Sequence, residues 1–202
     1  MNWRLSMLAF LVWGLAAGHP ALAQEADAPE ESGLDLSLRS GYAFISGIPN
    51  SLLYGMIPVR LEGRYLFDSH RALGLFLQYG HGLTHQDAGC LVADSCAAAD
   101  YLFGIDLSYR NSPIGRVTPW QALAIGYEVL HVGTTSYRGW QYAELQVGGD
   151  VALGQSLLLG PFGSAAIADF GTVSTTGGSD YDLSGPGLHY WLQVGLRVTL
   201  GI

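Results

Sequence analysis

The last fourteen residues of the chain, 189–202, alternate between large apolar side chains and mostly polar ones. Because successive side chains of a strand point to opposite faces, this alternation predicts a β-strand with one apolar and one polar face. Seven earlier segments have similar character, and clusters of Gly, Pro, Asn, Asp and Ser separate them. We therefore expect eight strands, over residues 33–44, 55–67, 72–81, 100–110, 119–131, 139–153, 157–169 and 189–202.

The connections between these segments differ in length in a regular way. The two longest, 82–99 and 170–187, fall at one end of an up-and-down arrangement. The two shortest, 68–71 and 153–156, fall at the other end. Membrane barrels have long external loops and short periplasmic turns, so we expect the first end to be external. The remaining connections are expected to be 45–54 and 132–138 at the external end and 111–118 at the periplasmic end.

The beginning of the chain has the layout of a secretion signal. Arg4 precedes an apolar run that is too short for an ordinary membrane span, and Ala21 and Ala23 form a small-x-small cleavage site. We expect a signal peptide over residues 1–23; an uncleaved anchor or a buried helix is the alternative. Residues 24–32 are rich in acids and predict a flexible periplasmic tail, which leaves 33–202 as one domain.

Charge and hydropathy narrow the class of protein. The chain has no lysine, its formal net charge is −8, and its mean hydropathy is positive. A phosphate backbone needs a basic surface, so nucleic acid is excluded as a partner. No segment after the signal approaches the roughly 20 apolar residues of a spanning helix. If the mature chain lies in a membrane, it must form a closed barrel, because lipid leaves no partner for an open sheet edge.

The facing of the charged residues separates a membrane barrel from a soluble one. In a soluble barrel the charged face would look outward and the apolar side chains would fill the interior. Here the charged positions alternate with Gly, Ala and Ser, which suits the crowded lumen of a small barrel in which opposite charges pair. We expect a lumen network of Asp35, Arg39, Arg60, Glu62, Arg64, Asp106, Arg110, Glu128, Glu144, Asp150 and Arg197. Tyr142 is expected on the same inward face, whereas the segment 157–169 is apolar on both faces and its facing stays open.

The only two cysteines, Cys90 and Cys96, lie in one of the long connections. In an exported chain, a close pair predicts a disulfide that closes a small loop. A metal site with His81 and His85 is the competing interpretation, but C-x5-C is not a recognised zinc spacing. We expect the disulfide, and no metal or cofactor.

With these segments in place, the chain resembles the small eight-stranded outer-membrane barrels of the OmpA transmembrane-domain and OmpX type. The closing strand looks like the assembly signal of that group in Gln193, Gly195, Val198 and Leu200, but it ends in Ile202 where a terminal Phe is typical. The resemblance implies an all-β, eight-stranded antiparallel up-and-down transmembrane β-barrel in a bacterial outer membrane. It also implies outer-membrane lipid, lipopolysaccharide and the barrel-assembly machinery as partners.

Three functions fit such a barrel. A structural or surface-interaction role through the external loops is the one that we expect, because loops on a rigid scaffold commonly carry function. Passage of a small solute or hydrophobic compound through the lumen is the second. The third is lipid A modification, which needs a hydroxyl, a histidine and an acid close together. Candidates near the external rim are His81, His131, His189, Ser136, Ser184 and Asp169, yet no His-x-Ser motif like that of lipid A deacylases is present, and we expect no enzyme.

Overall fold

The computed structural model describes residues 33–47, 53–84, 97–154, 156–175, 181–183 and 187–202. Its long strands are β1 (Gly33–Gly47), β2 (Leu53–Leu66), β3 (Arg71–Thr84), β4 (Ala98–Arg110), β5 (Val117–Val132), β6 (Thr135–Ala152), β7 (Leu157–Thr175) and β9 (Leu188–Gly201). A two-residue strand, β8 (Tyr181–Asp182), pairs with β7 at Thr172 and Val173. Within these ranges, no helix is long and apolar enough to cross a membrane.

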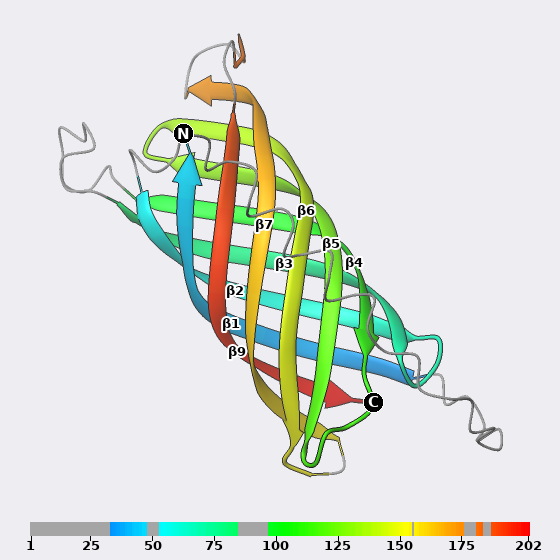
Figure 1. Ribbon diagram of the computed structural model, residues 1–202. Helices are drawn as coiled ribbons and strands as arrows, with labels where there is room; N and C mark the ends of the chain where they lie inside the picture. The colour runs from blue at the N-terminus through cyan, green and yellow to red at the C-terminus, as the bar shows by residue number, and fades with distance from the viewer. Residues whose placement is uncertain (1–32, 48–52, 85–96, 155, 176–180, 184–186) are drawn as a thin grey trace, which may run out of the picture.

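The eight long strands form one closed barrel. Strands β1 to β7 pair antiparallel with their neighbours in chain order, and β9 pairs with both β7 and β1. The strands run steeply inclined around a common interior (Figure 1). The expected all-β, eight-stranded antiparallel up-and-down barrel is therefore confirmed. We call the end where β1 begins the proximal end and the end where β1 finishes the distal end.

One expected connection is wrong. Residues 132–138 are not a loop, because Val132 and Thr135 pair directly and only Gly133 and Thr134 form the turn. Gly133 has a φ of +57°, a left-handed conformation that glycine adopts without steric cost. The residues that follow the turn, TSYR, lack the apolar alternation that marks the other strands, so the sequence pattern missed the start of β6.

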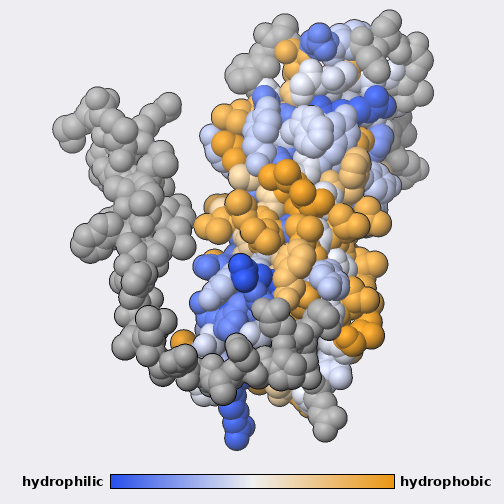
Figure 2. Space-filling model, turned by 90° about the vertical axis from the view of Figure 1, so that its right-hand side faces the viewer, coloured by the Kyte–Doolittle hydropathy of each residue, from blue (hydrophilic) through white to orange (hydrophobic). Residues whose placement is uncertain are grey.

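The wall of the barrel is apolar on the outside. Leu75, Leu77 and Leu196 are 59–69% exposed, and similar side chains cover the other long strands. Apolar residues gather across the middle of the face in Figure 2. The facing of β7 is now settled: Phe162, Ala166, Ala168 and Phe170 point inward and are buried. An inward polar and outward apolar wall is the reverse of what a soluble barrel presents to water.

Candidate functional site

Charged side chains from β1, β2 and β6 meet across the lumen. Arg39 Nη2 lies 2.9 Å from Glu144 Oε1, and Arg60 Nη1 lies 2.6 Å from Glu144 Oε2. The Nε atoms of the same two arginines lie 3.3 and 3.0 Å from Glu62 Oε1. All four side chains are buried. Each charge therefore has opposite charges at contact distance in place of water, which is the condition for tolerating ions in an interior.

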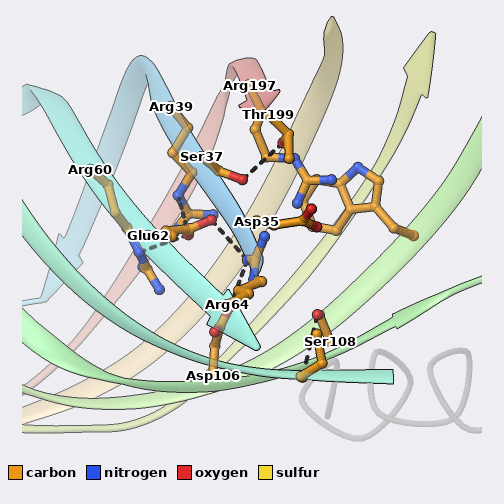
Figure 3. Close-up of polar contacts among 12 residues, drawn as sticks. Asp35, Ser37, Arg39, Arg60, Glu62, Arg64, Asp106, Ser108, Arg197 and Thr199 are labelled. Carbon is orange, nitrogen blue, oxygen red and sulfur yellow. Dashed lines mark hydrogen bonds and ion pairs between the residues drawn. The ribbon is translucent and has the colours of Figure 1, made fainter. Parts of the chain in front are cut away.

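The pairing continues from this centre toward the proximal end. Arg64 Nη2 lies 2.8 Å from Glu62 Oε2 and 2.6 Å from Asp106 Oδ2. Figure 3 shows the side chains of Arg39, Arg60 and Arg64 around Glu62. Nearer the proximal end, Arg110 pairs with Asp35. Glu62 is thus shared by three guanidinium groups, and Arg64 links the central and proximal carboxylates.

Aromatic rings flank the guanidinium groups. The guanidinium carbon of Arg60 lies 3.3 Å from the ring centroid of Phe76, and that of Arg197 lies 3.5 Å from the ring centroid of Trp120. Arg197 pairs with Asp150, and Trp120 Nε1 donates a hydrogen bond of 3.1 Å to the same carboxylate. Stacking on a ring face stabilises a cation and fixes its plane, so the charges are packed as well as paired.

A β-bulge decides which side chains of β6 reach the lumen. The register of β6 against β7 shifts between Gln141 and Ala143. Gln141 and Glu144 consequently both point inward, and Gln141 Nε2 donates to Glu144 Oε2 over 3.4 Å. Tyr142, which strict alternation assigns to the inward face, is 56% exposed on the outward face, so that prediction is wrong. An inserted residue reverses the facing of all residues before it, and a period-2 pattern cannot register it.

A second polar cluster lies in the distal part of the lumen. His189 Nε2 lies 3.1 Å from Glu128 Oε2, and Trp191 Nε1 donates to Glu128 Oε1 over 3.0 Å. The ring of Phe170 stacks on His189 with a centroid distance of 4.1 Å. Asp100 is buried beside them, and its side chain contacts that of Glu128. We call Asp100, Glu128 and His189 the distal cluster.

The alternation of apolar and polar residues predicts only Glu128 of this cluster to lie in the lumen. Asp100 has the same parity on β4 as Asp106, so the alternation that found Asp106 could also have found it. Asp100 is not assigned to the lumen because it is the first residue of the expected strand. His189 opens its expected strand too, which predicts a rim position, although the residue is fully buried on the inward face of β9.

The structure brings most of the expected lumen residues into contact. All eleven point inward; ten are buried and Arg110 is partly exposed. They form four groups: Arg39, Arg60, Glu62, Arg64, Asp106 and Glu144; Asp150 with Arg197; Asp35 with Arg110; and Glu128 in the distal cluster.

The remaining expected sites are placed as follows. On β9, Gln193 points inward, whereas Val198 and Leu200 point outward, and Gly195 lies against the backbone of Ser40. Cys90 and Cys96 lie outside the described residues, so the disulfide stays a prediction. Among the described residues, no group of three or more His, Cys, Asp and Glu side chains could hold a metal ion.

One part of the expected triad chemistry is present at the distal rim. Ser136 Oγ lies 2.6 Å from His131 Nδ1, because the two residues pair across β5 and β6. Among the described residues, the other side-chain contact of His131 is with the ring of Tyr101, and no carboxylate pairs with it. His189 lies inside the barrel, and Ser184 lies outside the described residues. The described part of the chain therefore offers a serine–histidine pair without an orienting acid.

Comparisons with known proteins identify the fold. No protein-family model matches this sequence, and no curated protein matches it. Neisserial surface protein A superposes with a TM-score of 0.55 at 13% identity, over 84% of this chain and 97% of its own. The outer membrane protein AlkL gives 0.54 at 13% identity, over 92% of this chain and 95% of its own. A major outer membrane protein from Thermus thermophilus gives 0.50 at 13% identity, over 84% and 99%. The chain has the fold of small outer-membrane β-barrels, and the expected resemblance to them is confirmed at that level.

Proposed function

We propose that the protein is an outer-membrane β-barrel with a closed lumen, and that it has a structural or surface-interaction role carried by the segments at its distal end. In this orientation the distal end faces outside and the proximal end faces the periplasm. The predicted signal peptide supports export. The apolar outward wall supports a lipid environment, with outer-membrane lipid and lipopolysaccharide as the surrounding partners.

The observation that carries this proposal is the ion-pair packing across the lumen. An eight-stranded barrel has an interior just wide enough for side chains. Here Arg39, Arg60, Glu62 and Glu144 bridge from β1 and β2 to β6, and all four are buried. A solute would have to separate these pairs to pass. We infer that passage through the lumen is not the activity, and that the protein acts through the segments at its distal end.

Planar-bilayer recording tests the closed lumen. The purified, folded chain should give no stable unitary currents. A double variant, Arg60→Ala with Glu62→Ala, removes one charge of each sign and should give measurable leak in samples that still show the heat-modifiable gel shift of a folded barrel. Steady unitary conductance of the unmodified protein would overturn the proposal in favour of transport.

A complementation experiment separates the structural role from the surface role. Cells that lack the protein would receive either the full chain or a chain in which residues 84–96 are replaced by Asn-Gly, a favoured two-residue hairpin turn that suits the pairing of β3 with β4. If envelope resistance to detergent returns with both chains, the barrel alone is sufficient and the role is structural. If resistance returns only with the full chain, the role belongs to the replaced segment. Return with neither chain, at equal surface levels, would count against the proposal.

Lipid modification is the second candidate, and only the Ser136–His131 hydrogen bond favours it. An activated serine would react with a long-chain alkyl fluorophosphonate, and Ser136→Ala would abolish the labelling. We expect no labelling of the unmodified protein, because His131 has no carboxylate partner among the described residues. Labelling that depends on both Ser136 and His131, with release of fatty acid from lipopolysaccharide, would establish an enzyme instead.

A further inference from the structure

Hydrogen-bond chemistry fixes the protons of His189. Its Nδ1 atom lies 2.9 Å from the carbonyl oxygen of Gly187, which can only accept, so Nδ1 carries a hydrogen. Its Nε2 atom lies 3.1 Å from Glu128 Oε2. That contact needs another proton, either on the imidazole or on the carboxyl group. Glu128 and His189 therefore hold, as a pair, one proton more than a neutral imidazole and an ionised carboxylate would.

Asp100 adds a second requirement. It is 1% exposed, and its side chain contacts the carboxyl of Glu128 and the amide of Gln78. Two buried carboxyl groups in contact share a proton, because two negative charges at that distance in the interior repel each other strongly. Asp100 thus stands as a neutral acid next to the Glu128–His189 pair.

The charges around the distal cluster do not remove its need for protons. The five inward arginines below it pair with five carboxylates, those of Asp35, Glu62, Asp106, Glu144 and Asp150, which leaves them balanced. Of the strands around the cluster, β7 presents the acidic Asp169 and β3 presents the neutral Gln78, while Glu144 of β6 is already paired with Arg39 and Arg60. The residues of β1 and β2 that line the cavity beside the cluster are Ala43 and Met56, which carry no charge. An acidic neighbour such as Asp169 favours a retained proton in the cluster.

The space beside the cluster excludes a hydrated metal ion. Asp100, Glu128, Gln78 and Gln193 line a cavity of about 10 Å³, which is about the smallest volume that accommodates one water molecule. Within the described ranges no set of side chains forms a metal site. A proton is the cation that fits.

We propose that Asp100, Glu128 and His189 form a proton-binding site in the distal lumen, which holds two protons at neutral pH in addition to the one on His189 Nδ1. The protons keep this part of the lumen neutral. His189 Nδ1 donates to the carbonyl of Gly187, which also accepts from the backbone N–H of Phe170, so the cluster is tied to β7 and to the start of β9. Alkaline titration would leave uncompensated charge in the interior and weaken the start of β9.

A matched pair of variants tests the site. Asp100→Asn replaces a neutral acid by a neutral amide, so the variant should fold and keep the heat resistance of the unmodified protein at pH 7. Asp106→Asn removes an ionised partner of Arg64 and should lower the heat resistance clearly. Heat resistance of the unmodified protein should fall between pH 7 and pH 10, and that of the Asp100→Asn variant should fall less.

Infrared spectroscopy of the unmodified, folded protein gives the direct readout. At pH 7 it should show the C=O band of a protonated carboxyl group, shifted in D₂O, which is weaker or absent in Asp100→Asn and unchanged in Asp106→Asn. Absence of that band in the unmodified protein overturns the proposal without any variant. Loss of folding in Asp100→Asn at pH 7 also overturns it, because the amide mimics the proposed neutral state.

Discussion

Arg64 shows how a single residue supports the interior. Its side chain is 2% exposed, and it contacts both Glu62 and Asp106. Arg64→Ala would leave the Asp106 carboxylate buried without its cation, which costs about 3–5 kcal/mol of unfolding free energy. Urea unfolding in detergent micelles, followed by the heat-modifiable gel shift, measures this loss. Arg110→Ala should be damaging as well, but less so, because the Arg110 side chain is 21% exposed.

Arg71 is the matched control for Arg64. Its Nε atom lies 2.7 Å from Asp68 Oδ2, but the side chain is 67% exposed. Arg71→Ala should cost only ~0–1 kcal/mol, because solvent screens an exposed pair. Equal losses in the two variants would mean that the buried pairs contribute no more than surface ones.

The turn at Asp68, outside the barrel wall, should have a pH-dependent stability. Its Oδ1 accepts hydrogen bonds from the backbone N–H groups of His70 and Arg71, at 2.8 and 2.7 Å, and these bonds lower the pKa of Asp68 to about 2. Because the pKa of Asp68 is lowered, its ionised carboxylate stabilises the turn at any pH above the ordinary pKa of an aspartate. That gain is lost as the pH falls from about 4 to about 2. An NMR titration of the Asp68 carboxyl carbon checks it, and a midpoint near 4 would contradict it.

At the scale of elements, the pairing of β1 with β9 depends on glycine. Gly41 pairs with Gly195, and a Cβ atom at Gly195 would lie 2.1 Å from the carbonyl oxygen of Ser40 and 2.8 Å from the Cα of Gly41. Gly195→Ala should therefore destabilise the closing pair of strands by about 1–3 kcal/mol. Gly63→Ala on β2 is the control, since no atom lies within 4 Å of its added methyl group. Equilibrium unfolding of both variants decides it, and an undisturbed Gly195→Ala barrel would refute the close approach.

Much of the strand order could be predicted from sequence because the two faces of each long strand meet different environments. The alternation in β4 and β9 is strong, since one face meets apolar surroundings and the other meets charged partners. Inward positions such as Arg39 and Asp106 follow directly from that alternation. The same pattern does not place Asp100 and His189 in the lumen. Each is the first residue of its expected strand, where alternating neighbours lie on only one side in the sequence.

Other features depend on backbone geometry that a period-2 pattern does not contain. The bulge after Gln141 inserts one residue and turns Tyr142 outward. The turn at Gly133 follows from a left-handed residue, which allowed β6 to begin earlier than its apolar positions indicated. The specific partners, such as Glu144 with both Arg39 and Arg60, depend on which strands lie opposite each other once the barrel closes.

The whole molecule is inverted relative to a water-soluble barrel. Its charges are paired inside, while apolar side chains cover the outward wall over far more area than the few hundred Å² that soluble monomers expose. Leu77 lies near the middle of β3 and is 65% exposed, between Leu61 and Phe103 on the adjacent strands. Leu34 is also outward and 54% exposed, but it lies at the proximal end of β1.

Depth in the membrane should therefore separate two chemically identical substitutions. Leu77→Arg places a charge at mid-height and should cost ~2–4 kcal/mol in phospholipid vesicles, whereas Leu34→Arg should cost only ~0–1 kcal/mol. Urea unfolding of the barrel in vesicles measures both costs. In water the two exposed positions would tolerate arginine equally. Equal, small costs in vesicles would mean that the outward wall does not face lipid, and would remove the basis for placing this barrel in a membrane.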